Sequence, residues 1–284
     1  MEESPPGRLA PTSWERQVMP PPHPSETLRV EFIGTGNAYG IPASGCECQI
    51  CKEAAINLER RRTPPCAIIA TDESALIIDA GDLSLAQKLA RYNVEAILIS
   101  HFHAGHLYGL NSLPAGQIPH TAYGPPDGGE SDLRDGIADI KLNEVLPAKT
   151  LKVGDFEVTP VLLNHGPITY GYCISIGGYR IGYLCDTCEL PPNTEEFITN
   201  WTPDILIIDC NQPPERPRPN HNTPHQAFAI HRRCGSKRSY LSHLSCDADR
   251  WLENNPDQIP VGVEIARDGM VAPLGVGVSR RAAG

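Results

Sequence analysis

Three histidines stand close together in the segment Ser100-His-Phe-His-Ala-Gly-His106. They follow an apolar run over 95–100 that we expect to be a buried strand. A neutral imidazole is the commonest side-chain ligand for transition metals in proteins. Three such rings at the end of one strand predict that His101, His103 and His106 bind metal rather than fill the core.

Three more expected strands also end in side chains of the ligand type. His165, Asp186 and His243 each follow a short apolar run. Ligands commonly bind where several strands of one sheet end. Together with the histidine motif, these residues provide enough donors for two metal ions that share a bridging carboxylate.

A second candidate site is rich in cysteine. Cys46, Cys48 and Cys51 place three thiols within one short segment. Thiolates typically complete a closed tetrahedral Zn²⁺ site, so this spacing predicts a structural zinc ion that needs a fourth ligand. We expect Cys66, Cys173, Cys210 and Cys234 to be small apolar core residues.

The composition limits the class of protein. The 284 residues include 24 Lys and Arg against 34 Asp and Glu, which gives a net charge of −10. No apolar run reaches the roughly 18 residues that a membrane span needs. The acidic balance disfavours a general nucleic-acid binder, whose binding face is usually basic. Ten cysteines without a recognisable secretory signal indicate a cytoplasmic protein with reduced thiols.

Paired apolar strands alternate with helices along the chain. One helix is expected over 223–233, with Thr223 as its N-cap and Gly235 beyond its end. This order of elements predicts an α/β fold in which two sheets pack face to face beneath outer helices. We expect one domain over 28–275, a disordered proline-rich extension over 1–27 and a flexible tail over 276–284.

The histidine motif resembles that of the metallo-β-lactamase-fold hydrolases. Their signature is His-x-His-x-Asp-His, followed at a distance by His, Asp and His, and this chain matches it except at Gly105. The segment 76–81 is similar to the first motif of that fold, in which Asp79 would support the site without binding metal. The resemblance implies a single-domain αββα sandwich.

Several further motifs resemble a narrower group, the PhnP-type cyclic phosphodiesterases of the phosphonate (carbon–phosphorus lyase) pathway. The matching segments lie at 34–36, 45–51, 122–126, 169–172, 186–187, 209–214, 220–222 and 251–252. The resemblance covers about residues 28–270. It implies a homodimer that hydrolyses 5-phospho-ribosyl 1,2-cyclic phosphate.

The resemblance assigns six residues to two catalytic ions, Zn²⁺ or Mn²⁺. The first ion would bind His101, His103 and His165, the second would bind His106 and His243, and Asp186 would bridge them. Two divalent ions about 3.5–4 Å apart generate a hydroxide for attack on phosphorus and neutralise phosphate oxygens.

Four other residues receive roles. The resemblance implies that His221 protonates the leaving group or contacts the substrate, and that Cys246 completes the structural zinc site. Arg216 and Arg218, in a proline-rich loop, are candidates to meet a substrate phosphate. His225 is a neighbouring histidine that a sequence alone does not separate from His221 in this role.

Gly105 stands where the family has an aspartate ligand of the second ion. Three interpretations stay open. The second ion binds with an extra water, one tight ion suffices, or the chain is an impaired homologue. Cys185 and Cys188 flank Asp186 and could compensate as soft ligands, although two small buried thiols are the favoured interpretation.

The sequence thus predicts a metal-dependent phosphoric diester hydrolase with a small cyclic phosphate as substrate and neither membrane nor nucleic acid as partner. One alternative is an RNA-processing hydrolase related to tRNase Z, which the acidic charge disfavours. The other is a metal-bound homologue without catalytic activity, which only Gly105 supports.

Overall fold

The computed structural model describes residues 28–113, 121–126 and 141–274. The expected N-terminal extension over 1–27 and the expected tail over 276–284 lie outside these ranges. No helix in the described ranges is both long and apolar enough to cross a bilayer.

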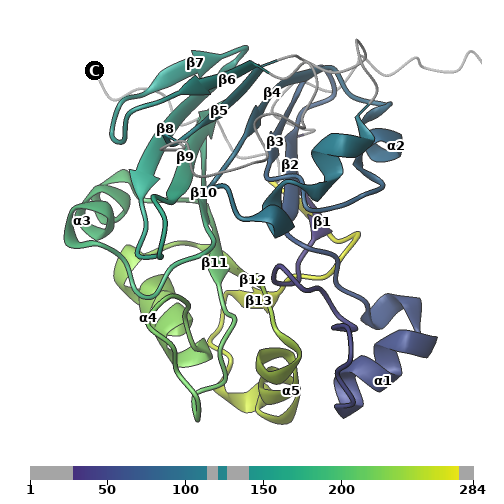
Figure 1. Cartoon of the computed structure of the whole chain (residues 1–284). Coiled ribbons are helices and arrows are strands. Elements are labelled where there is room, and N and C mark those ends of the chain that lie inside the picture. The colour runs from purple at the N-terminus through teal and green to yellow at the C-terminus, as the bar shows by residue number, and fades with distance from the viewer. Residues whose placement is uncertain (1–27, 114–120, 127–140, 275–284) are drawn as a thin grey trace, which may run out of the picture.

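Two sheets of seven strands each lie face to face (Figure 1). The first sheet has the order β14-β1-β2-β3-β4-β5-β6 and the second the order β13-β12-β11-β10-β9-β8-β7. The strands of the first sheet are β1 (Arg29–Gly34), β2 (Cys66–Ala70), β3 (Ala75–Ile78), β4 (Val94–Leu98), β5 (Thr121–Gly124), β6 (Lys141–Glu144) and β14 (Val271–Pro273). Those of the second are β7 (Leu151–Val153), β8 (Phe156–Leu162), β9 (Tyr170–Ile176), β10 (Tyr179–Leu184), β11 (Ile205–Asp209), β12 (Arg238–Ser242) and β13 (Val263–Ile265).

Helices cover the outer faces of both sheets (Figure 1). The α-helices are α1 (Gln49–Ile56), α2 (Leu85–Leu89), α3 (Pro192–Trp201), α4 (Pro224–Cys234) and α5 (Cys246–Asn254). Short 3-10 helices occur as η2 (Leu58–Arg60), η3 (Ala104–His106), η4 (Tyr108–Ser112) and η5 (Pro256–Gln258). Side chains of α2 pack on the first sheet, and those of α3, α4 and α5 pack on the second.

The central strands are buried on both faces. In β2, Ala67 and Ile69 point into the layer between the sheets, whereas Cys66 and Ile68 point toward the outer layer beneath α2. Because successive strand residues face opposite sides, a strand covered on both sides is apolar throughout. This three-layered core confirms the predicted αββα sandwich.

Local signals position most elements where the sequence predicts them. Thr223 caps α4 through a hydrogen-bonded capping box with Gln226, and the helix ends at Gly235 in the left-handed conformation. Gly154, with φ of +56°, makes the tight turn between β7 and β8. The helix α1 was not predicted. It begins within the cysteine cluster, at Cys48 as N-cap.

Candidate metal centre

Polar side chains gather where strands of both sheets end. Strands β10, β11 and β12 run parallel, as do β3 and β4, so their C-terminal ends meet at one edge of the sandwich. Asp79, Asp186 and His243 follow β3, β10 and β12, and their φ angles are +56°, +64° and +60°. Non-glycine residues rarely adopt this conformation, and they do so preferentially at functional sites.

Three of the predicted ligands, His101, His103 and His165, form one compact group. His101 Nε2 lies 2.7 Å and His165 Nε2 lies 3.4 Å from His103 Nδ1. Burial lowers the pKa of all three rings, because it disfavours the charged imidazolium. Lowered pKa values favour the neutral rings that bind metal, and the ligand nitrogens of the three residues lie within 4.8 Å of one another, as a cation site requires.

Asp186 lies at the centre of the histidines. His106 Nε2 and His243 Nε2 each lie 3.3 Å from one of its two carboxylate oxygens. Burial alone would raise the Asp186 pKa, but His243 and His106 outweigh it and hold the pKa well below its usual range. Within the described part of the chain, Asp186 Oδ2 and His243 Nε2 are buried and make no hydrogen bond. Buried polar atoms without hydrogen-bond partners, at a site of this composition, fit the binding of a cation.

Two further carboxylates hold the rings from behind. Asp79 Oδ2 lies 2.8 Å from His106 Nδ1, which leaves His106 Nε2 directed at Asp186. Burial opposes protonation of His106, yet Asp186 and Asp79 together raise its pKa to about 9. Asp209 Oδ2 lies 2.8 Å from His221 Nδ1 and 3.3 Å from His243 Nδ1. Carboxylates in this position fix the orientation of metal-binding imidazoles.

Asp209 was not given a role by the sequence analysis. It ends the buried strand β11, and it also accepts hydrogen bonds from the backbone N–H groups of Asp186 and Asn222. The signal was an aspartate at the end of an apolar strand, the same pattern that identified Asp186. His221 and His243 pull the pKa of Asp209 below its usual value against the effect of burial.

A cavity of about 370 Å³ opens over the cluster. His221 and Arg218 line it, together with His103, His165, Asp186 and His243. Arg216 instead forms an ion pair with Asp247 at 2.6 Å. His225 is absent from the lining of this cavity, and its ring lies against Trp251 and Gln258. The structure therefore places His221 rather than His225, and Arg218 rather than Arg216, in the lining of the cavity.

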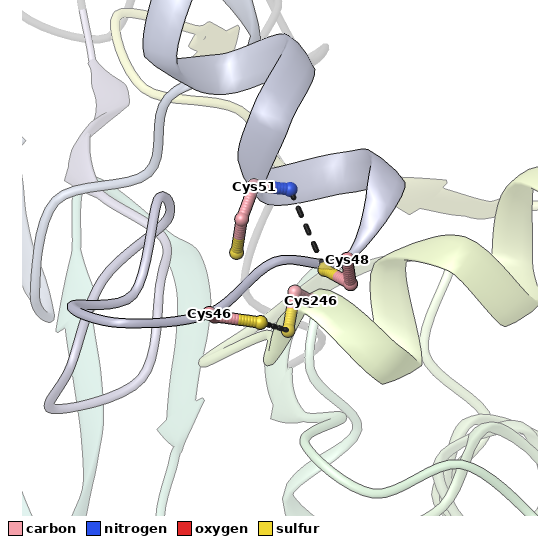
Figure 2. A group of neighbouring side chains, drawn as sticks. All are labelled: Cys46, Cys48, Cys51 and Cys246. Atoms are coloured by element: carbon pink, nitrogen blue, oxygen red, sulfur yellow. Dashed lines mark hydrogen bonds between the residues drawn. The ribbon is translucent and has the colours of Figure 1, made fainter.

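The cysteine cluster joins two segments that are far apart in the sequence. Cys46, Cys48 and Cys51, around the start of α1, face Cys246 at the start of α5 (Figure 2). The four sulfur atoms lie within 4.8 Å of one another, and those of Cys46 and Cys246 are 3.9 Å apart. A tetrahedron with Zn–S bonds of about 2.3 Å has edges of about 3.8 Å, so the group fits a Zn²⁺ ion.

The surroundings of the four sulfur atoms suit thiolates bound to an ion. The backbone N–H groups of Ala43 and Cys51 donate to the sulfur atoms of Cys51 and Cys48, respectively. Burial raises the pKa of Cys51 to about 11 and raises that of Cys246 still further. The free thiols of Cys51 and Cys246 would stay protonated near pH 7, whereas zinc binding would favour their thiolates.

We expect Cys246→Ala to release about one zinc ion per chain and to lower the thermal unfolding midpoint, because the ion would tie α1 to α5. Metal analysis and a thermal melt check this. Cys234→Ala is the matched control, since it removes a buried core thiol and should lower the midpoint without loss of zinc. Unchanged zinc content in Cys246→Ala would contradict a site of four cysteines.

Cys185 and Cys188 do not approach the metal centre as soft ligands. Cys185 is buried in the apolar layer between the sheets. Cys188 Sγ accepts a hydrogen bond from Gln226 Nε2 at 3.5 Å. Neither sulfur belongs to a ligand cluster among the described residues. They therefore do not replace the carboxylate that Gly105 lacks.

Comparisons with known proteins agree with this architecture. The family model described as "Beta-lactamase superfamily domain" matches residues 76–244. Ribonuclease Z of Methanopyrus kandleri is 28% identical over an aligned length of 159, and the match covers 52% of this chain and 50% of that protein. A protein of Porphyromonas gingivalis named octanoyltransferase is 25% identical over an aligned length of 264, and the match covers 86% of this chain and 51% of that protein. The chain spans about half the length of these curated relatives.

A crystal structure described as a new diphosphatase from the PhnP family has a similar fold. Its TM-score is 0.73 at 23% sequence identity, and the match covers 86% of this chain and 97% of that one. The match to the family model spans more than half of the chain and includes both the histidine motif and His243. The chain therefore belongs to the beta-lactamase superfamily and has the metallo-β-lactamase fold.

Proposed function

We propose that the chain is a metal-dependent phosphodiesterase of the PhnP type, which hydrolyses a small cyclic phosphate such as 5-phospho-ribosyl 1,2-cyclic phosphate. The observation that carries this proposal is the position of His221 and Arg218 in one cavity with the metal-binding group. His101, His103, His165 and Asp186 would hold a divalent ion there. When bound, such an ion polarises phosphate oxygens and neutralises their charge.

The size of the cavity favours a small substrate. At about 370 Å³, it lies at the lower end of the range of about 300–1,000 Å³ that is typical of small-molecule sites. Arg218 provides a cation in the cavity, and a guanidinium pairs well with phosphate oxygens. These features support a compact phosphate ester as the substrate.

His221 is suited to protonate the leaving oxygen. Its Nδ1 is engaged by Asp209 at 2.8 Å, so Nε2 is the nitrogen that remains for a substrate. Burial would lower the pKa of His221, but Asp209 outweighs this effect and raises it. A raised pKa favours the protonated ring, which is the form that a general acid needs.

The alternative is RNA processing, which the likeness to ribonuclease Z favours. To separate the two, we would offer the purified chain 5-phospho-ribosyl 1,2-cyclic phosphate and, separately, a precursor tRNA with a 3′ trailer. We expect turnover of the cyclic phosphate and no cleavage of the RNA at physiological salt, because a chain of net charge −10 repels a polyanion. RNA cleavage without turnover of the cyclic phosphate would overturn the proposal.

A further inference from the structure

A close contact occupies the place from which a side chain at residue 105 would start. Gly105 is buried within η3. A Cβ atom on Gly105 would lie 2.6 Å from Ala38 Cβ and 2.7 Å from Ala38 Cα. Non-bonded carbon atoms prefer about 3.5–4.0 Å, so a side chain fits only if the backbone moves.

The loop that carries Ala38 is anchored on both sides. Before it, the Asn37 N–H donates to the carbonyl oxygen of Leu244 at 3.0 Å. After it, Ile41 and Arg62 exchange two backbone hydrogen bonds of 2.8 and 2.9 Å. The loop therefore cannot withdraw from Gly105 without breaking backbone hydrogen bonds.

The segment around Gly105 is equally fixed on its other side. The Ala80 N–H donates to the carbonyl oxygen of His106 at 2.7 Å. A Cβ atom on Gly81 would lie only 2.5 Å from the carbonyl oxygen of Gly105. The backbone at Gly105 is thus enclosed between Ala38 and the segment that follows β3, and an aspartate has no space there.

The side chains that remain for a second ion are His106, His243 and the shared Asp186. His106 and His243 approach opposite oxygens of Asp186, each at 3.3 Å, and their ring centres are 5.5 Å apart. The described residues form four candidate ligand groups, and none of these holds both rings. The group with His243 also contains Asp209, but this carboxylate lies against His221 Nδ1 and His243 Nδ1, at 2.8 and 3.3 Å. With Gly105 in place of an aspartate, the described residues offer the second position no further carboxylate, whereas His101, His103 and His165 form one group at the first.

We propose that the catalytic centre of this chain is built for one tightly bound ion, held by His101, His103, His165 and Asp186. The contact between Gly105 and Ala38 closes the place of the second ion's own carboxylate. A second ion would then have only His106, His243 and the shared Asp186, and would bind far more weakly than the first. This inference rests on the proposed function only in so far as the site takes a divalent metal.

The direct test is the number of ions that the metal centre binds. The chain, with zinc retained in its cysteine site and the metal centre stripped, is titrated with Mn²⁺ by calorimetry and followed by electron paramagnetic resonance. We expect one tight Mn²⁺ per chain with the spectrum of an isolated ion. A second ion should bind at least about 100-fold more weakly, since even lost outer partners cost about 10–100-fold. Two ions of similar affinity with an exchange-coupled spectrum would overturn the proposal.

Variants test the closure itself. We expect Gly105→Asp and Gly105→Ala both to lower the unfolding midpoint, and Gly105→Asp to gain no second Mn²⁺. Gly166→Ala is the steric control, because a Cβ there meets nothing within 4 Å. Ala38→Gly should lower the unfolding midpoint less in the Gly105→Asp background than in the wild type. Residues in contact have non-additive effects, and removal of the Ala38 Cβ relieves part of the clash. A Gly105→Asp chain with the wild-type midpoint and a second Mn²⁺ would refute the closure.

The two proposals fail separately. If one Mn²⁺ binds and the cyclic phosphate is not hydrolysed, the proposed function is wrong and the single-ion centre stands. If the cyclic phosphate is hydrolysed while two ions bind equally, the single-ion centre is wrong and the proposed function stands.

Discussion

Asp186→Asn is expected to lower turnover of the cyclic phosphate by more than about 100-fold and to release the catalytic ion. Asp186 is the carboxylate on which the histidines converge, and loss of an outer partner alone costs about 10–100-fold. Asparagine keeps the size of the side chain and tolerates the φ of +64° at this position. The fold should therefore persist, and the change isolates the loss of one negative charge.

Turnover and metal content, measured on the same preparation, check this expectation. Asp204→Asn is the matched control, because Asp204 lies just before β11, away from the cavity lining, and binds Lys237 at 2.7 Å. We expect the control to keep its activity and its metal. An Asp186→Asn chain that keeps both would contradict the central place of this carboxylate.

His221→Ala is expected to slow hydrolysis of esters with alkyl leaving groups by about 10²–10⁴-fold, the usual contribution of general acid catalysis. Esters of nitrophenol should be affected much less, because their leaving oxygen needs little protonation. The bound metal should be unchanged, since His221 is not one of the proposed ligands. His225→Ala is the control, as its ring contacts Trp251 and Gln258 outside the cavity lining.

Rates for the two kinds of ester decide the role of His221. Equal losses for both would exclude it as the acid. The pH profile gives a second readout, because an acid must be protonated and activity falls as pH rises through its pKa. Asp209 raises the pKa of His221, so Asp209→Asn should move this alkaline fall to lower pH.

The fold and much of the site were predictable because the signals are local. Each of His165, Asp186 and His243 ends an apolar strand, and parallel strands bring such ends to one edge. The helix α4 was equally clear, since Thr223 and Gly235 carry the capping chemistry of its two ends.

The parts that were missed depend on contacts between distant segments. Nothing in the sequence near Gly105 indicates that Ala38 packs against it, because 67 positions separate the two residues. The helix α1 is short, and it places only Ile50, Cys51 and Ala54 in the core. The choice between Arg216 and Arg218 depended on Asp247, whose ion pair with Arg216 forms across the fold.

The measurement that tests the central claim most directly is metal-dependent turnover of 5-phospho-ribosyl 1,2-cyclic phosphate. The catalytic centre is stripped of metal, and Mn²⁺ or Zn²⁺ is then added in steps. We predict that hydrolysis is absent from the stripped chain, rises with added metal and saturates as the catalytic ion binds. A chain that binds the ion and still leaves the cyclic phosphate intact at every metal concentration would contradict the account.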